Sequence, residues 1–349
     1  MLSRTAAAGL LAQGLMLAAG LSIQPAAALS PASTTAGIPC SGVWKLNEDL
    51  TKRTRSPIGP IYQFFETWGT NGWMRMNTGD LNATINGAEW HFERFDNKPY
   101  QVFGGDPSLQ HSRKITDRIV ETIRVREGKE ADYSLVVFSK DCKRVTYYFP
   151  EGNDRHGAPG KTHYYNDIRV FDRIEAPGGD AAADGIFGGW MLNRQASKLM
   201  LPPKNAETVV IVPWGTSGWI WNQLSGGAYQ PEDLMQGVKR VECGAAQGPT
   251  AIACKGPPSR MMLYWATWDS KTFPTYGSDP GQVQAKQING RAFEVTFSKG
   301  GQGSGQADKV SVMFSPDGRH LNVMSKSGAV EDLRVYDRID ADHWPAVTP

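Results

Sequence analysis

The sequence lacks the residue groupings on which most enzymes and nucleic-acid-binding proteins depend. Its 349 residues include only four cysteines and six histidines, and neither type is clustered at the spacing of a zinc site. No Ser-His-Asp arrangement and no glycine-rich phosphate loop can be recognised. The 37 lysines and arginines nearly balance the 35 acidic residues and form no basic block. We therefore expect no metal, no cofactor and no nucleic-acid partner.

Long apolar runs are absent after the first 28 residues. Arg4 precedes an apolar segment from Ala6 to Ile23, and Ala26 and Ala28 then form an A-x-A site. This pattern is typical of a cleaved secretory signal, so we expect residues 1–28 to be removed and the mature protein to be periplasmic or secreted. The alternative is an uncleaved anchor, because the run has about the length that spans a membrane. We expect no membrane span in the mature chain.

The rest of the chain contains two copies of one sequence unit. The N-terminal motifs recur at an offset of 146 residues and later ones at an offset of 173. Their shared order along the whole unit indicates a duplication. The matching segments are GVWKLN at 42–47 with GGWMLN at 188–193, WGTNGW at 68–73 with WGTSGW at 214–219, FD at 95–96 with WD at 268–269, and IRVFDRI at 168–174 with LRVYDRI at 333–339.

The duplication defines the domain organisation. We expect one domain at 40–175 and a second at 188–341, joined by a linker at 176–187 that is rich in glycine and alanine. The change of offset places 27 extra residues between Trp219 and Trp268 in the second copy. We expect this insertion to form an additional hairpin.

Each copy is a string of short, alternating runs separated by turn residues. Asn71-Gly72 and Asn86-Gly87 favour tight hairpin turns, and no long run has the 3.6-residue period of an amphipathic helix. Eight to ten strands in about 135 residues must either stack as a sandwich or close as a barrel. Closure removes the unpaired strand edges, so we favour a barrel.

The opening Gly-x-Trp-Lys-Leu and the closing Arg-Val-[Phe/Tyr]-Asp-Arg-Ile resemble the first and last strands of the calycin superfamily, which includes lipocalins and intracellular fatty-acid-binding proteins. Each copy is most similar to bacterial lipocalin-like domains. The resemblance implies an all-β chain with two tandem antiparallel lipocalin-like β-barrels. It also implies that Trp44 and Trp190 plug the barrel floors, with Arg173 or Arg338 stacked over the tryptophan.

Four cysteines in an exported chain suggest two disulfides, although free thiols are the alternative. Three pairings are possible. In an up-and-down barrel, Cys40 before the first strand and Cys142 in the turn two strands before the last lie at the same rim, which makes them plausible neighbours. Cys243 and Cys254 flank a turn in the insertion and are positioned to pair across it.

Aromatic residues are the first candidates for ligand binding. Pairs of tryptophans bracket a predicted hairpin tip in each copy, where they would either line the mouth for an apolar or aromatic ligand or stiffen the hairpin. Another tryptophan in each copy occupies a corresponding strand and is expected to point inward. These candidates are Trp68, Trp73 and Trp90 in the first copy and Trp214, Trp219 and Trp265 in the second.

The last strand of each copy supplies polar candidates. By resemblance to fatty-acid-binding proteins, Arg334 and Tyr336 would grip a ligand carboxylate in the second copy, and Arg169 would do so alone in the first, where Phe171 lacks the hydroxyl. The strand pattern argues for a different orientation. Its apolar residues alternate with the arginines and would ordinarily face inward, which leaves the arginines in solvent.

Three functional classes follow. The first is an exported lipocalin-like binding protein for a small amphipathic or aromatic molecule. The second is a cofactor-independent isomerase, hydratase or hydrolase of hydrophobic molecules, for which Glu121, Glu294 and His91 are the first acid-base candidates. The third is a structural module with sealed barrels. An open interior lined by Trp, Tyr and Arg would favour binding, whereas an open interior with a buried carboxylate–histidine pair would favour catalysis.

Overall fold

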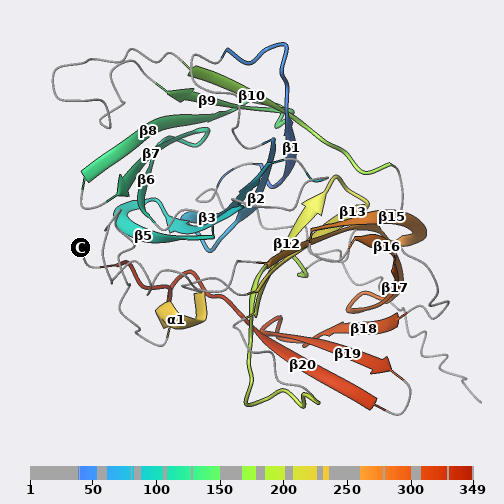
Figure 1. Cartoon of the computed structure of the whole chain (residues 1–349). Helices are drawn as coiled ribbons and strands as arrows, with labels where there is room; N and C mark the ends of the chain where they lie inside the picture. The colour runs from blue at the N-terminus through green and yellow to red at the C-terminus, as the bar shows by residue number, and fades with distance from the viewer. Residues whose placement is uncertain are drawn as a thin grey trace, which may run out of the picture. The chain divides into compact units, whose positions relative to one another are not determined.

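The computed structural model describes residues 38, 40–52, 61–79, 81, 88–104, 108–126, 129–149, 167–177, 185–200, 207–225, 231–235, 260–277, 280–299, 308–327 and 330–347. Within these ranges the chain is all-β, apart from one short helix, α1 (Pro231–Met235). The strands form two closed antiparallel barrels of ten strands each (Figure 1). This confirms the predicted fold class.

The first barrel, drawn from blue to green in Figure 1, contains the strands of the first copy. Consecutive strands pair, and β1 closes the barrel by pairing with both β2 and β10. The strands are β1 (Gly42–Leu46), β2 (Tyr62–Thr67), β3 (Gly72–Thr78), β4 (Glu89–Arg94), β5 (Asp96–Gly104), β6 (Leu109–Thr116), β7 (Ile119–Arg126), β8 (Lys129–Phe138), β9 (Arg144–Phe149) and β10 (Asp167–Arg173).

The second barrel repeats this topology, with β11 pairing with β12 and β20. Its strands are β11 (Gly188–Leu192), β12 (Glu207–Trp214), β13 (Gly218–Ser225), β14 (Arg260–Thr267), β15 (Asp269–Gly277), β16 (Gly281–Asn289), β17 (Ala292–Lys299), β18 (Asp308–Phe314), β19 (His320–Ser327) and β20 (Val330–Arg338). The insertion lies between β13 and β14. It includes α1, and its remainder at 236–259, with the predicted hairpin, lies outside the described residues.

The repeated Gly-x-Trp motif builds the floor of each barrel. Trp44 and Trp190 are fully buried, and the guanidinium of Arg173 or Arg338 lies over the indole at 5.5 and 5.1 Å from the ring centroid, respectively. Gly188 has φ +141°, and a Cβ at that position would lie 2.9 Å from Nη2 of Arg338. Glycine therefore leaves space for the arginine. The stacking of the arginine over the tryptophan agrees with what the resemblance implied.

A disulfide ties the start of the first barrel to the β8–β9 turn. Cys40 and Cys142 are bonded, with their Cα atoms 5.5 Å apart. This confirms the predicted pairing, which followed from the two cysteines sharing one rim. The proposed partners Cys243 and Cys254 lie outside the described residues.

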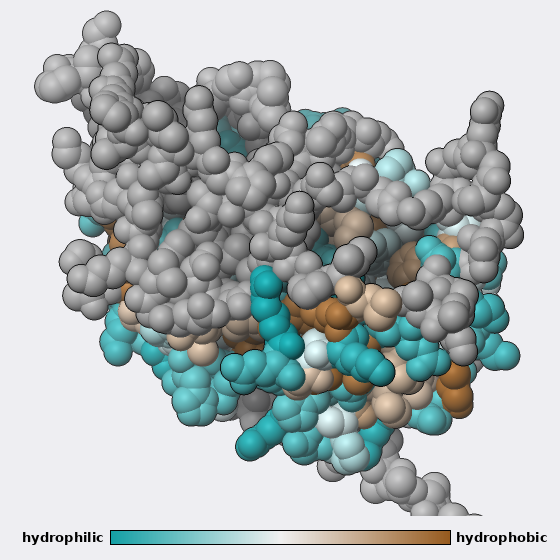
Figure 2. All heavy atoms as spheres, turned by 60° about the horizontal axis from the view of Figure 1, so that its bottom comes forward, coloured by the Kyte–Doolittle hydropathy of each residue, from teal (hydrophilic) through white to brown (hydrophobic). Residues whose placement is uncertain are grey.

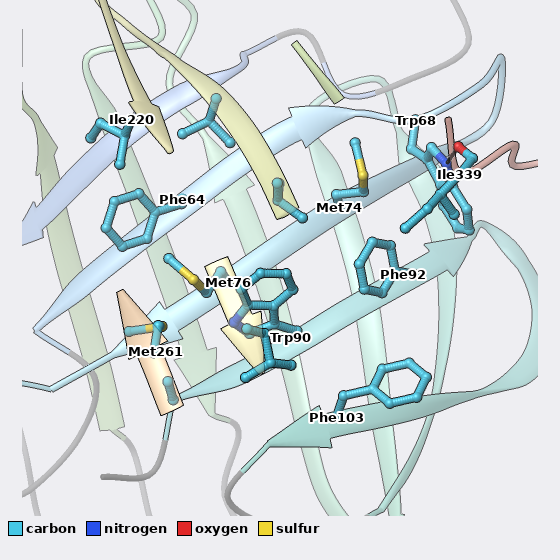
Figure 3. Close-up of a cluster of buried hydrophobic side chains, with 14 of the residues drawn as sticks. Phe64, Trp68, Met74, Met76, Trp90, Phe92, Phe103, Ile220, Met261 and Ile339 are labelled. Atoms are coloured by element: carbon cyan, nitrogen blue, oxygen red, sulfur yellow. Dashed lines mark hydrogen bonds between the residues drawn. The ribbon is translucent and has the colours of Figure 1, made fainter. Parts of the chain in front are cut away.

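Both barrels also bury part of their outer faces in a shared hydrophobic cluster, here called the inter-barrel cluster. Trp265 of β14 contacts the rings of Tyr62 and Phe64 of β2, at centroid distances of 6.2 and 6.3 Å. Figure 3 shows the cluster, in which side chains of the first barrel (Phe64, Trp68, Met74, Met76, Trp90, Phe92 and Phe103) lie with Ile220, Met261 and Ile339 of the second half.

The segment after β20 packs on the first barrel. Trp68 donates its indole N–H to the carbonyl of Ile339 at 3.1 Å, and the amide of Val347 donates to the carbonyl of Pro99 at 2.8 Å. Trp344 is 1% exposed and contacts Phe92 at a centroid distance of 5.0 Å. The C-terminal segment therefore belongs to the inter-barrel cluster rather than to the second barrel alone.

On one face of the molecule (Figure 2), the described residues form a mostly polar surface. On the face shown in Figure 2, hydrophilic residues predominate and hydrophobic residues show as smaller areas between them. Among the described residues, no helix has the length and apolar character needed to cross a membrane.

Candidate functional site

The interior of the second barrel contains a cavity of about 200 Å³. Its walls are mainly aromatic and aliphatic, with a polar group on one side. The lining residues are Trp219, Trp221, Gln223, Met262, Tyr264, Val295, Phe297, Val310, Val312, Val323, Ser325, Arg334 and Tyr336. An apolar cavity of about 150 Å³ holds benzene. The space therefore suits a molecule with one or two small rings.

Strand alternation decides which side chains reach this cavity. On β13, Trp219, Trp221 and Gln223 point inward, whereas Ile220 and Leu224 belong to the inter-barrel cluster. Both faces of this strand are therefore buried. Tyr264 on the neighbouring β14 stacks edge-on against Phe297, with centroids 4.9 Å apart, and stiffens the aromatic wall.

The polar side of the cavity is an Arg-Tyr-Glu group. Nη1 of Arg334 donates to both carboxylate oxygens of Glu207, at 3.0 and 2.9 Å, and the Tyr336 hydroxyl donates to the same carboxylate. The Glu207 side chain is 4% exposed, and that of Arg334 is 32% exposed. A second carboxylate, that of Asp332, lies 3.4 Å from Nε of Arg334. The guanidinium is thus already held between two carboxylates.

The electrostatics of this group keep Tyr336 protonated and Arg334 charged. Burial raises the pKa of Tyr336 well above its ordinary value, and the adjacent Glu207 charge raises it further. Burial is the largest single effect and lowers the pKa of Arg334, but Glu207, Tyr336 and Asp332 together outweigh it and raise the pKa of the guanidinium. Tyr336 therefore remains a hydrogen-bond donor and Arg334 a cation throughout the physiological range.

The first barrel has a different interior, built on a buried histidine. Nδ1 of His91 lies 2.9 Å from Oε1 of Glu93, and both side chains are fully buried. Because a carboxylate only accepts hydrogen bonds, Nδ1 carries the proton. Arg75 donates to the ring of His91 at 3.0 Å and to the Tyr147 hydroxyl at 3.3 Å. Gln110 joins the group by donating to Glu93.

Glu93 is the most heavily hydrogen-bonded member of this interior. It accepts from the indole of Trp73 at 3.2 Å, from Gln110 at 2.9 and 3.0 Å, and from Ser112 and His91. Burial alone would raise its pKa, but His91, the Arg75 charge and Ser112 lower the pKa to about 2. Glu93 is therefore an anchor that orients His91, rather than a group that exchanges protons near neutral pH.

The duplication allows the two interiors to be compared position by position. Arg75 pairs with His91 across β3 and β4, and Trp221 pairs with Tyr264 across β13 and β14, so the ladders align the copies. Nine inward positions are polar in the first barrel, and most of their counterparts are apolar. In the same order, Arg75, His91, Glu93, Gln110, Ser112, Thr122, Arg124, Ser134 and Tyr147 correspond to Trp221, Tyr264, Ala266, Val283, Ala285, Val295, Phe297, Val310 and Val323.

The comparison shows that this fold does not require a polar interior. The second barrel closes with the same topology around an apolar interior. Buried ionic networks are often no more stabilising than well-packed apolar residues of similar volume. The polar interior of the first barrel is therefore not needed to close a barrel of this topology.

The structure separates the predicted binding residues into three groups. Trp219, Arg334 and Tyr336 line the cavity, so the arginine strand has its Arg-x-Tyr face inward. The expectation that the alternate, apolar face points inward was wrong. Trp73 lies near the floor of the first barrel, and Arg169 lies over the ring of Phe149, at 4.8 Å. The four others, Trp68, Trp90, Trp214 and Trp265, belong to the inter-barrel cluster.

Trp90 and Trp265 do not point inward as expected. Each lies on a strand whose outer face is covered in the inter-barrel cluster, and their sequence neighbours His91 and Tyr264 take the inward positions. Two of the acid-base candidates also lie elsewhere. Glu121 binds Arg113 and Tyr133, and Glu294 lies 3.3 Å from the exposed Lys309.

Among the residues of the two interiors, His91, Arg334 and Tyr336 were candidates from the sequence, whereas Glu207, Arg75 and Glu93 were not singled out. Glu207 differs from its counterpart in the first copy, Ile61, and this difference was a detectable signal. Arg75, His91 and Glu93 alternate with apolar residues, and the pairing of their strands brings them together. Among the described residues, no group of three His, Cys, Asp or Glu side chains is arranged to hold a metal ion.

Comparison of the chain with known protein families and with curated proteins found no match.

Proposed function

We propose that this protein binds a small amphipathic or aromatic molecule in the second barrel. The cavity of about 200 Å³ carries this proposal, because its walls are mainly aromatic and aliphatic and include only a few polar side chains. Such a combination is typical of small-molecule sites, where apolar walls supply burial and a few polar groups fix orientation. The proposal includes a lipocalin-like mode of binding, which the Gly-x-Trp floor and the covering arginine support.

We further propose that the protein acts after export, in the periplasm or outside the cell. The pattern from Arg4 to Ala28 supports cleavage of a signal, and the Cys40–Cys142 disulfide suits an oxidising compartment. Detection of a mature N-terminus at Leu29 in secreted or periplasmic fractions would test this. Recovery of the intact N-terminus in a membrane fraction would contradict it.

The binding proposal is tested by calorimetric titration of the full chain with 1-naphthol, an uncharged two-ring molecule. Val310 lines the cavity from β18, and Ser311 beside it on the same strand is exposed. Val310→Trp should fill the cavity and weaken binding by at least about tenfold, since the ligand would lose its apolar contacts. Ser311→Trp is the matched control and should bind as the wild type does. Equal binding by all three proteins would contradict the proposal.

A second function is supported by the buried His91–Glu93 pair, which resembles the orientation of a general base. The proposed activity is cofactor-independent isomerisation, hydration or hydrolysis in the first barrel. The protein would be incubated with extract from its native medium in D2O, and deuterium at carbon would be followed by mass spectrometry. Incorporation that is lost in His91→Gln supports the activity, and incorporation that persists in that variant contradicts it.

A further inference from the structure

The Arg-Tyr-Glu group in the cavity wall holds a carboxylate that belongs to the protein itself. We infer that Glu207 occupies the position at which Arg334 and Tyr336 would otherwise hold the acid group of a ligand, so that the second barrel selects uncharged ligands over carboxylates. This inference rests on the proposed binding function and specifies the chemical class of the ligand.

Glu207 accepts hydrogen bonds from both Arg334 and Tyr336. Arg334 directs Nη1 to both oxygens of the Glu207 carboxylate, and Tyr336 donates its hydroxyl to one of them. An arginine and a tyrosine converging on one carboxylate are the groups that would bind the acid end of a ligand in a largely apolar pocket. Glu207 is nearly sealed from solvent, so water does not compete for these bonds.

The charge of the cavity wall also disfavours a ligand carboxylate. Arg334 is the one cationic residue among those that line the described cavity, and it is flanked by Glu207 and Asp332. One guanidinium against two carboxylates leaves a net negative group. A ligand carboxylate entering this space would be repelled and would lose hydration without a free cation to compensate. An uncharged ligand would instead meet Gln223, Ser325 and the aromatic wall.

The first barrel provides an internal comparison. Its counterpart of Arg334 is Arg169, but the positions of Glu207 and Tyr336 are taken by Ile61 and Phe171. The carboxylate and the hydroxyl that binds it therefore occur together in one copy and are replaced together in the other. This is expected if the two residues act as a unit around the arginine.

The test compares 1-naphthol with 1-naphthoate, which differ mainly in the charged group, by calorimetric titration of the full chain. The wild type should bind 1-naphthol at least about tenfold more tightly than 1-naphthoate, because the carboxylate meets an occupied guanidinium. Glu207→Ala should tighten 1-naphthoate binding by about tenfold or more and change 1-naphthol binding by less than about threefold. Glu207→Gln, which removes the charge but little volume, should give a smaller gain for 1-naphthoate.

The double variant Glu207→Leu with Arg334→Leu is the control, because it removes the carboxylate and the cation together. It should show no gain for 1-naphthoate over the wild type, and thermal melts would confirm that each variant is folded. If Glu207→Ala is folded and binds 1-naphthol but gains nothing for 1-naphthoate, the inference fails and the binding function stands. If the wild type binds the two molecules equally, the inference also fails. If no protein binds either, the proposed function itself fails.

Discussion

At the scale of single residues, the barrel floors show how one glycine enables a neighbouring interaction. The arginine of the last strand lies over the first-strand tryptophan in both barrels. This contact needs the space that a Cβ at the preceding glycine would occupy. Two copies that differ at most interior positions share this arrangement, which indicates that it closes the barrel rather than serves a ligand.

Gly188→Ala should lower the free energy of unfolding by about 1–3 kcal/mol, because alanine would be strained at φ +141° and its Cβ would press on Arg338. Chemical denaturation would measure the effect. Gly290→Ala is the matched control, since no atom lies within 4 Å of a Cβ there. A destabilisation of equal size in both variants would contradict this account of the floor.

Glu66 on β2, a half-buried residue with one fully buried carboxyl oxygen, gives a residue-scale prediction about pH. Burial raises the pKa of Glu66 from 4.5 to about 8, against opposing effects of Ser41 and Arg338. Between these two pH values the folded protein holds a proton that the unfolded chain has released, so stability should fall as pH rises. Above about 8 the loss is complete.

Glu66→Gln should therefore flatten the decline in stability between pH 4.5 and about 8. Denaturation midpoints measured across this range would show it. Glu48→Gln, at an exposed position, is the control. An unchanged slope in Glu66→Gln would mean that the carboxyl is not protonated in the folded state.

At the scale of elements, the segment after β20 joins the end of the second copy to the first barrel. Trp344 lies among Trp68, Phe92 and Phe103, with ring centroids between 5.0 and 6.0 Å apart. Its burial is as complete as that of a core residue. The segment therefore contributes to stability, although it belongs to neither barrel wall.

Trp344→Ala should lower the free energy of unfolding by about 3–5 kcal/mol, as expected for removal of a fully buried aromatic side chain. Equilibrium denaturation would measure it. The neighbouring His343 has an exposed side chain, so His343→Ala should change stability by less than about 0.5 kcal/mol. A small effect in both variants would show that the segment does not pack stably.

The order of the strands and the residue pattern within each strand explain which sequence-based predictions were correct. The duplication, the barrels, the floor tryptophans and the Cys40–Cys142 pair depend on strand order and local pattern, which the sequence contains. Whether the Trp90 side chain points into the barrel or out of it depends on which outer face of the barrel becomes buried. That face can be identified only when both barrels are considered together.

The inward direction of Arg75 on β3 escaped prediction for the same physical reason. On β3, the apolar Met74 and Met76 face outward into the inter-barrel cluster, whereas Arg75 faces the barrel interior. This reverses the usual rule that apolar residues face the interior of a barrel. The sequence shows that polar and apolar residues alternate, but not which set is inside.

At the scale of the whole chain, two barrels with one topology have diverged, so that one interior is polar and the other is mainly apolar. The first contains a polar network around Arg75 and Glu93, and the second has a mainly apolar cavity whose one lining cation, Arg334, is held by Glu207. Duplication allows this divergence, because each closed barrel satisfies its own strand edges. We expect the two copies to differ in function accordingly.

The most direct test of this account is to locate a bound ligand. A crystal of the full chain soaked with 4-bromo-1-naphthol would give an anomalous bromine signal whose position is independent of any assumption about the site. The account predicts that the signal lies inside the second barrel, between Trp221, Phe297 and Val310. A signal inside the first barrel or on the outer surface, with the second barrel empty, would contradict it.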